Sequence, residues 1–346
     1  MSSVARDPQG GLSWRLKVPL AAVAALVVGL TGCTRSPSPE PTPEPTPTPT
    51  VSPAVLVEEA AQILELHGLY SAGDWSAERD ALIAAGANAG TLDEAHDLIA
   101  AAARDAGGRH ARFLPADERE ASYAEAPSAL PVVEATQGAT VTITVSAIGH
   151  DGRLAEEYAT AGVEGLAALA DADTCGFVVD LRGNWGGSAF PMLGAVSPLF
   201  DTEVVAGFVD RDGNQGWNTV TTASATSDDG YELRYASDAD IDTSVFAGKP
   251  IAVLQDFYTA SAAEMVLAAF AGQSNVTTFG EKSNGLATGV EGFMLADGSE
   301  ILLTTARFTD RAGAVMPEPI QPDVSAITSD APALAHDWLA EQCAVA

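Results

Sequence analysis

Two stretches of this chain share one pattern, a short apolar run followed by a turn of small residues and then by apolar residues at helical spacing. The apolar runs are residues 175–180 and 250–254, and helices are expected over residues 188–199 and 262–273. Residues 139–148 add a further strand-like run, and residues 154–170 a further helical stretch. Short apolar runs bounded by turn residues are typical of buried strands. Repeated strand–turn–helix units therefore predict an α/β core.

Ser261 lies at the centre of the second turn, in Thr259-Ala-Ser-Ala-Ala-Glu264. A serine on a tight strand-to-helix turn is exposed by the bend, and the amide of the next residue and the helix N-terminus can then stabilise an oxyanion. Ser261 is also a favoured N-cap residue, and Glu264, three residues later, completes a capping box. Taken alone, the stretch fits an N-cap at least as well as a nucleophile.

The first 33 residues have the features of a targeting segment. Arg15 and Lys17 precede the apolar stretch 18–30, which is too short for a stable membrane span. Leu30-Thr-Gly-Cys33 resembles the lipobox of bacterial lipoproteins at every position. That resemblance implies that Cys33 becomes a lipidated N-terminus, anchored to the cell membrane at its extracytoplasmic face. The alternative is an uncleaved anchor with an incidental cysteine.

Two segments of different character follow. Residues 34–54 consist almost entirely of Pro, Thr, Ser and Glu, which predicts an extended linker. Residues 55–108 carry apolar residues at three- and four-residue spacing between glycines, which predicts a small helical bundle. The expected helices are 55–69, 76–85 and 91–106. His67 and His96 lie within them and are expected to serve packing or solvation.

His110 follows the predicted helix stop at Gly107-Gly108. A histidine in a loop directly after a helix end is well placed to project into a cleft. As a lone residue, however, it would more commonly be an ordinary surface histidine.

The formal net charge of -30 argues against nucleic acid or anionic lipid as a direct partner. Such a charge would suit a cationic peptide, but the simpler explanation is that it keeps an exported protein soluble. The sequence contains no Cys/His cluster at metal-ligand spacing and no phosphate-binding loop. We therefore expect no metal and no nucleotide cofactor.

Cys175 and Cys343 are the cysteines that remain after cleavage at Cys33. An even pair in an exported protein is a candidate disulfide, here tying the C-terminal helix to the core. The alternative is a pair of buried thiols.

The ordered motifs together resemble the tail-specific, or carboxy-terminal processing, serine protease family. Asp180-Leu-Arg-Gly-Asn-Trp-Gly-Gly187 is similar to its oxyanion turn, and Thr259-Ala-Ser-Ala-Ala-Glu264 to its nucleophile motif. The later landmarks match in order, as Gly280-Glu-Lys282, Leu295-Ala-Asp-Gly-Ser299 and Ile320-Gln-Pro-Asp323. The match extends from about residue 105 to about residue 325.

Two departures from the family pattern are informative. The processing proteases use a Ser-Lys dyad whose lysine follows a glycine, but Leu286 follows Gly285 here, and Lys282 is interpreted as a surface residue. The chain also has no room for a PDZ domain between His110 and Asp180. Both departures resemble the nisin resistance protein branch, which has a helical bundle, no PDZ domain and a Ser-His dyad.

This resemblance implies an α/β fold with a crotonase-like β-β-α core over residues 109–325. The helical bundle of residues 55–108 precedes the core, and a C-terminal helix within residues 326–346 closes it.

The residues support a coherent chemistry. A serine hydroxyl needs an adjacent base, and the imidazole of His110 is suited to take its proton and return it to the leaving amine. Two amides, those of Gly187 and Ala262, are the expected donors to the tetrahedral intermediate. No third residue that orients His110 can be selected, since Glu264 is better explained as a cap.

The sequence therefore predicts a membrane-anchored serine endopeptidase that cleaves peptides or protein C-terminal tails through an acyl-enzyme. Antimicrobial peptide cleavage is the hypothesis that the nearest branch suggests. The alternative is a degenerate lipoprotein of the same fold that binds peptides without cutting them, because the family's lysine is missing. A hydrogen bond between His110 and Ser261 would favour the enzyme.

Overall fold

The computed structural model describes residues 51–71, 73, 75–125, 129–149, 154–235 and 241–345. The predicted signal segment, Cys33 and nearly all of the predicted linker lie outside these ranges. The elements below belong to one of the two units into which the chain divides, Pro49–Ala346.

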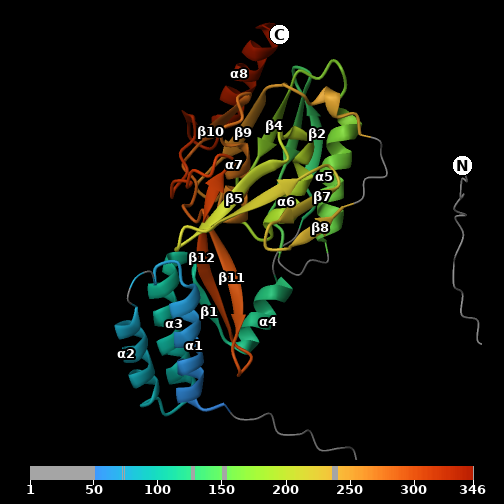
Figure 1. Ribbon diagram of the computed structural model, residues 1–346. Helices are drawn as coiled ribbons and strands as arrows, with labels where there is room; N and C mark the ends of the chain where they lie inside the picture. The colour runs from blue at the N-terminus through green and yellow to red at the C-terminus, as the bar shows by residue number, and fades with distance from the viewer. Residues whose placement is uncertain are drawn as a thin grey trace, which may run out of the picture. The chain divides into compact units, whose positions relative to one another are not determined.

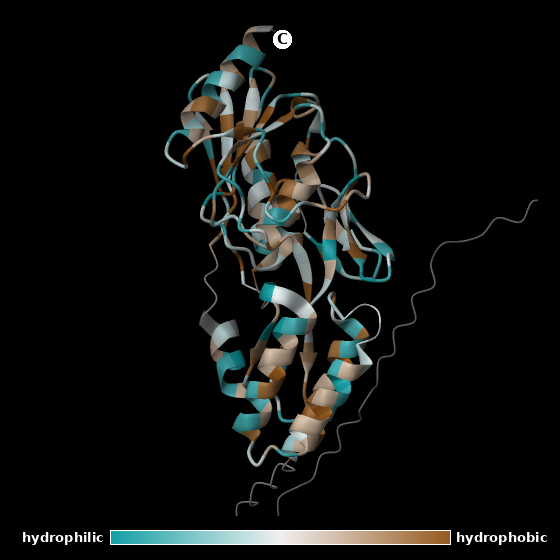
Figure 2. Ribbon diagram, turned by 90° about the vertical axis from the view of Figure 1, so that its left-hand side faces the viewer, coloured by the Kyte–Doolittle hydropathy of each residue, from teal (hydrophilic) through white to brown (hydrophobic). Residues whose placement is uncertain are grey.

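Three helices open the described chain, as the apolar spacing predicts: α1 (Pro53–His67), α2 (Ser76–Gly86) and α3 (Leu92–Gly107). The linker was predicted to extend to residue 54, but α1 begins at Pro53, because proline is favoured at the first helical position and Ser52 caps the helix. Thr91 caps α3 by accepting a hydrogen bond from the Glu94 amide. The ribbons of these helices change between apolar and polar residues along their length (Figure 2), as expected for helices with one buried face.

A six-stranded sheet forms the centre of the α/β core, in the order β13-β10-β9-β4-β3-β2. Its strands are β2 (Val132–Thr136), β3 (Thr140–Thr144), β4 (Gly176–Asp180), β9 (Ile251–Gln255), β10 (Val276–Gly280) and β13 (Val324–Ser325). All pairs are parallel except β2 with β3, which forms a hairpin. The parallel arrangement confirms the strand–turn–helix interpretation of the sequence.

Helices cover both faces of this sheet (Figure 1). The helices are α5 (Ala155–Leu169), α6 (Ala189–Ala195), α7 (Ala262–Phe270) and α8 (Ala331–Val345). Phe177 and Val179 of β4 pack in one core with α5, α6 and α7, whereas Val178 packs with α8 in another. Strands buried on both faces need apolar residues at every position, which explains the unbroken apolar runs of β4 and β9.

A second, antiparallel sheet has the order β1-β12-β5-β6-β7-β8, with β11 paired to β12. Its strands are β1 (Arg112–Leu114), β5 (Val204–Asp210), β6 (Gln215–Val220), β7 (Ser224–Ser227), β8 (Glu232–Arg234), β11 (Thr288–Met294) and β12 (Glu300–Asp310). Phe308 and Ala206 of this sheet share a core with α6 and α7. Those two helices are therefore packed between the two sheets.

The β11–β12 hairpin extends beyond the parallel sheet and packs against α1 and α3 (Figure 1). His96 Nε2 lies 2.7 Å from Asp297 Oδ2 in the hairpin turn. The His67 ring packs against Phe293, with ring centroids 4.8 Å apart. His67 therefore serves packing and His96 forms a polar contact with the hairpin turn, so both histidines join the helices to the hairpin.

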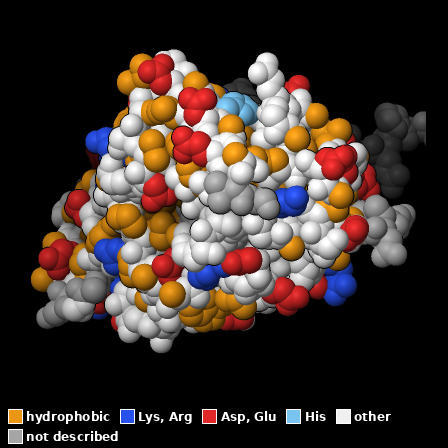
Figure 3. Space-filling view, turned by 90° about the horizontal axis from the view of Figure 1, so that it is seen from above, with side chains coloured by type: hydrophobic (Ala, Val, Ile, Leu, Met, Phe, Trp, Pro, Cys, Tyr) orange, Lys and Arg blue, Asp and Glu red, His pale blue; other side chains and the backbone are white. Residues whose placement is uncertain are grey.

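The remaining elements are short: α4 (Ala116–Glu125) and the 3₁₀ turns η1 (Gly108–His110), η2 (Ser197–Leu199) and η3 (Thr243–Val245). Cys175 precedes β4 and forms a disulfide with Cys343 of α8, with Cα atoms 5.7 Å apart. Acidic side chains are spread over the face shown in Figure 3, in keeping with the net charge of -30. None of the described helices combines the length and apolar character needed to cross a bilayer.

Candidate active site

Ser261 sits between the end of β9 and the first residue of α7, with backbone angles φ 52° and ψ -116°. N-cap residues normally have extended backbone angles, so capping alone does not explain this conformation. A non-glycine residue held in such a region costs about 1–3 kcal/mol. The turn has the form of a nucleophile elbow, which presents a serine hydroxyl on a sharp strand-to-helix bend. Ser261 is half-buried, so the turn is partly open to the surface.

The glycine turn after β4 lies directly against Ser261. A Cβ atom built on Gly186 would lie 2.9 Å from the Ser261 Cβ and 3.2 Å from the Ala262 nitrogen. Gly186 and Gly187 have φ values of 107° and 116°, where side chains are strained. The two turns are also joined directly, since the Ala260 amide donates to the Asn184 carbonyl at 3.0 Å.

The predicted oxyanion donors Gly187 and Ala262 therefore occupy adjoining turns. Ala262 is the first residue of α7, so the helix itself supplies no acceptor for its amide. The Gly186 amide donates to the Asn184 side-chain oxygen at 2.9 Å and is committed there. Gly187 pairs with Ile148 in an isolated bridge, which fixes its backbone next to the turn.

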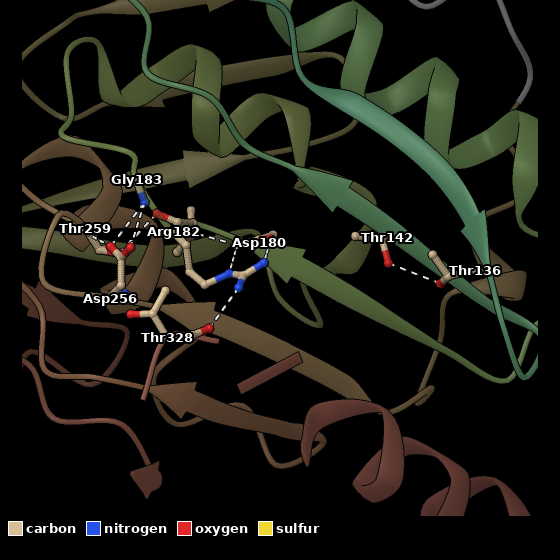
Figure 4. A network of polar contacts seen from close by, with 9 residues as sticks. Thr136, Thr142, Asp180, Arg182, Gly183, Asp256, Thr259 and Thr328 are labelled. Atoms are coloured by element: carbon tan, nitrogen blue, oxygen red, sulfur yellow. Dashed lines mark hydrogen bonds and ion pairs between the residues drawn. The ribbon is translucent and has the colours of Figure 1, made fainter. Parts of the chain in front are cut away.

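A polar network fixes the two turns relative to each other (Figure 4). The Asp256 carboxylate, after β9, accepts the Gly183 amide at 3.1 and 3.2 Å. Arg182 pairs with Asp180 at 2.6 Å and donates to the Thr328 carbonyl. The hydrogen bond to Asp180 raises the pKa of Arg182. The hydrogen bonds of this network use the Gly183 amide of the glycine turn and do not involve the Gly187 amide.

Glu264 is fully buried and joins the Ser261 turn to the loop at 283–287, called here the connecting loop. Its carboxylate accepts the Ser261 amide at 2.8 Å, the Ser283 hydroxyl, and the amides of Gly285 and Leu286. Burial raises the pKa of Glu264, although these hydrogen bonds favour its ionised form. The capping role that the sequence assigns to Glu264 is confirmed, and the same carboxylate organises the loop.

His110 contacts the residue that follows this loop. Its Nδ1 lies 2.7 Å from Thr288 Oγ1, at the start of β11. The neighbouring Arg109 guanidinium donates to the Asn284 side-chain oxygen at 2.9 Å. Among the hydrogen bonds of the described residues, none joins His110 to Ser261. Catalytic hydrogen bonds are often long without substrate, so the pairing of these two residues stays a prediction.

The remaining observations concern Lys282, Leu286, metal ligands and Thr288. Lys282 is exposed, as its interpretation as a surface residue requires. Leu286, which stands where the family's lysine is expected, contributes only its amide to the Glu264 carboxylate. Within the described ranges, no three His, Cys, Asp or Glu side chains are placed to hold a metal ion. Thr288 was not identified from the sequence, because a threonine that opens a strand carries no distinguishing pattern.

This chain is similar to proteins of known sequence or structure over most of its length. The Nisin-resistance protein of Lactococcus lactis subsp. lactis is 28% identical over 288 residues, which cover 83% of this chain and 86% of the relative. A lipoprotein structure from Streptococcus agalactiae has a TM-score of 0.69 at 24% identity, covering 85% of this chain and 98% of that one. The photosystem II D1 C-terminal processing protease has a TM-score of 0.55 at 16% identity, covering 81% and 94%.

The two structures show that the mixed α/β fold is shared. The profile of peptidase family S41 matches residues 153–326, half of the chain. The matched segment contains both the glycine turn and the Ser261 turn. This chain therefore belongs to peptidase family S41.

Proposed function

We propose that the protein is a serine endopeptidase that cleaves peptides or protein tails through an acyl-enzyme. The backbone of Ser261 carries the proposal: its φ of 52° and ψ of -116° place it on an elbow that capping does not require. Membership of a peptidase family and the glycine turn against Ser261 support it further. The fold of the catalytic unit is proposed to be crotonase-like.

Each residue has a defined role in the proposed reaction. Ser261 Oγ attacks the scissile carbonyl while the His110 imidazole takes its proton. The amides of Gly187 and Ala262 stabilise the oxyanion of the tetrahedral intermediate. His110 then protonates the leaving amine, and a water molecule hydrolyses the acyl-enzyme by the same steps in reverse.

Exposed aromatic side chains flank the two turns and suit a peptide substrate. Trp185 precedes Gly186, and Phe257 and Tyr258 lie in the turn before Ser261. They are 47%, 49% and 64% exposed, respectively. Aromatic rings at a surface provide contact area for apolar side chains at a small cost in conformational entropy. The acidic surface would add attraction for a cationic peptide.

The proposed location is the extracytoplasmic face of the cell membrane, through a lipid on Cys33. The lipobox-like sequence before Cys33 supports it, as does the description of a similar solved structure as a lipoprotein. The similarity to a Nisin-resistance protein supports an antimicrobial peptide, such as a lanthipeptide, as substrate. Unmodified peptides and protein tails are the other substrate classes to be tested.

Cleavage of a mixed peptide panel by the full-length protein in detergent tests the proposal, with products identified by mass spectrometry. We expect Ser261→Ala and His110→Ala each to lower the rate by about 10⁴-fold or more with folding intact. Lys282→Ala is the matched control and should remain within about twofold, because its side chain is exposed. A large loss in the Lys282 variant would identify a different base and refute the Ser-His assignment.

The second candidate function is peptide binding without cleavage. Leu286 in place of the family's lysine favours it. Saturable binding of the same peptides, equal in the wild-type protein and Ser261→Ala and without products, would establish it. Products that disappear in Ser261→Ala would exclude it.

A further inference from the structure

We propose that Thr288 is the positioning residue for His110, holding the imidazole in the tautomer that a general base requires. The inference rests on the proposed serine peptidase function. Thr288 Oγ1 lies 2.7 Å from His110 Nδ1, and the Thr288 side chain is 3% exposed. A hydrogen bond of this length restricts the rotation of the ring, and the direction in which it is donated sets the tautomer.

The tautomer follows from which atom donates. If Nδ1 carries the proton and donates to Thr288 Oγ1, the lone pair of the neutral ring lies on Nε2. Nε2 can then accept the Ser261 proton, and Nδ1–H keeps its hydrogen bond when the ring becomes an imidazolium. The opposite tautomer would place a proton on Nε2 and leave no base for the serine. Thr288 therefore has to act as the acceptor in this contact.

The surrounding contacts fix Thr288 relative to the nucleophile. The Thr288 amide donates to the Leu286 carbonyl at 2.7 Å, and the Leu286 amide donates to the Glu264 carboxylate at 2.8 Å. The same Glu264 carboxylate accepts the Ser261 amide at 2.8 Å. A continuous series of short hydrogen bonds thus runs from the backbone of Ser261 to the ring of His110. Disturbing the acceptor at its far end would misplace the base without touching the serine.

Arg109 strengthens this arrangement. Its guanidinium donates to Asn284 Oδ1 at 2.9 Å and to the Gly285 carbonyl at 3.0 Å. The residue next to His110 is therefore attached to the connecting loop, while Thr288 binds the histidine ring itself. These two attachments leave the imidazole little freedom to rotate.

The test compares Thr288→Val, which removes the hydroxyl, with Thr288→Ser, which keeps it. We expect Thr288→Val to lower kcat for peptide cleavage by about 10–100-fold, a part of what general base catalysis contributes, with KM unchanged. Thr288→Ser should stay within about threefold of the wild-type protein. Thr309→Val is the matched control, because the buried Thr309 hydroxyl on the neighbouring strand has no partner in the described structure. It should leave kcat unchanged.

A second readout is independent of turnover. Selective ¹⁵N labelling of the five histidines and NMR of the full-length protein report the tautomer of each ring, and His110→Ala assigns the His110 signal. We expect the Nδ1–H form in the wild-type protein and a shift towards Nε2–H in Thr288→Val. An Nε2–H ring in the wild-type protein would overturn the inference. So would a Thr288→Val variant that keeps both the wild-type tautomer and the wild-type kcat.

The two readouts separate the inference from the proposed function. If a fluorophosphonate probe does not label Ser261 and no peptide is cleaved, the peptidase proposal fails. The tautomer of His110 in the wild-type and Thr288→Val proteins then still decides whether Thr288 positions the ring. If Ser261 is labelled at equal rates in both proteins, the peptidase proposal stands and the role of Thr288 is refuted.

Discussion

Replacing Ser261 with glycine should stabilise the protein while abolishing its activity. The reason is the φ of 52° at Ser261, a conformation that glycine adopts without steric cost. Relief of about 1–3 kcal/mol of backbone strain is opposed by about 0.5–1 kcal/mol, because glycine makes the unfolded chain more flexible. The expected net gain over Ser261→Ala, which keeps the strain, is roughly 1 kcal/mol.

Urea unfolding of Ser261→Gly and Ser261→Ala measures this difference directly, because neither variant has the hydroxyl. At equal m-values, the shift in midpoint gives the difference in free energy of unfolding. Ala139→Gly is the matched control: Ala139, with φ 58°, is the other non-glycine residue with positive φ within the described ranges. It should also stabilise the protein, with peptide cleavage unchanged, because the β2–β3 turn contributes nothing to the proposed site.

One result would refute the strain argument. If Ser261→Gly were less stable than Ser261→Ala by about 0.5–1 kcal/mol, the ordinary penalty for glycine, Ser261 would not be strained in solution. The elbow would then be a normal N-cap, and the observation that carries the proposed function would be lost. Loss of stability in both Ser261→Gly and Ala139→Gly would instead show that positive φ values are no guide to strain in this chain.

Two further predictions concern stability. The disulfide between Cys175 and Cys343 joins residues 168 positions apart, and by the chain-entropy estimate its reduction lowers the free energy of unfolding by up to about 5 kcal/mol. The urea midpoint should therefore fall by the equivalent of about 2–5 kcal/mol under reducing conditions. An unchanged midpoint would contradict this. Burial raises the pKa of Asp297, but hydrogen bonds from Ser299 and His96 outweigh it and hold that pKa below its ordinary value. The pair therefore stabilises the fold above about pH 4 and loses this contribution as the pH falls through the lowered pKa. His96→Ala should cost about 1 kcal/mol near pH 6 and flatten the acid branch of a stability–pH curve; a parallel curve would refute the assignment.

The sequence was most informative where local pattern and tertiary environment agree. Strands β4 and β9 were predicted within one residue at each end, and the helices predicted at 154–170 and 262–273 correspond to α5 and α7. These strands are buried on both faces, so each position is apolar and the run is easy to recognise. Helix α7 ends at Phe270, three residues before its predicted end, because residues 271–273 leave the helix in a turn.

The antiparallel sheet was largely missed for a physical reason. Strands β7 and β8 have only four and three residues, and β5 and β6 contain Gly, Asn and Asp. Buried and exposed positions alternate irregularly along these strands. Strand β5 pairs with β12, whose residues come about a hundred positions later in the chain. No local sequence pattern can therefore predict this pairing. Residues 292–305 do carry a local hairpin signal, apolar residues on both sides of Asp297-Gly298, but they are only the end of two longer strands, β11 and β12.

Residues of the candidate site also differ in whether a local motif or only a tertiary contact marks them. Ser261 and Gly187 stand in recognisable local motifs and can be selected as candidates from the sequence alone. Thr288 cannot be selected in this way, because its contact with His110 joins residues 178 positions apart. Only tertiary structure brings together a loop histidine and a strand-opening threonine, both of which are ordinary in sequence. The residues that position a catalytic group are therefore harder to predict than the group itself.

Ser261 combines the features of an N-cap and of a nucleophile elbow, the two interpretations that the sequence left open. Glu264 accepts the Ser261 amide as a cap residue would, yet Ser261 keeps the backbone angles of an elbow. A hydrogen bond to a charged group contributes about 1.5–3 kcal/mol, similar to the estimated strain of about 1–3 kcal/mol. The hydrogen bond between the Ser261 amide and Glu264 thus offsets the backbone strain at Ser261. Because the same carboxylate also fixes the connecting loop, capping, strain and the placement of His110 depend on one buried residue.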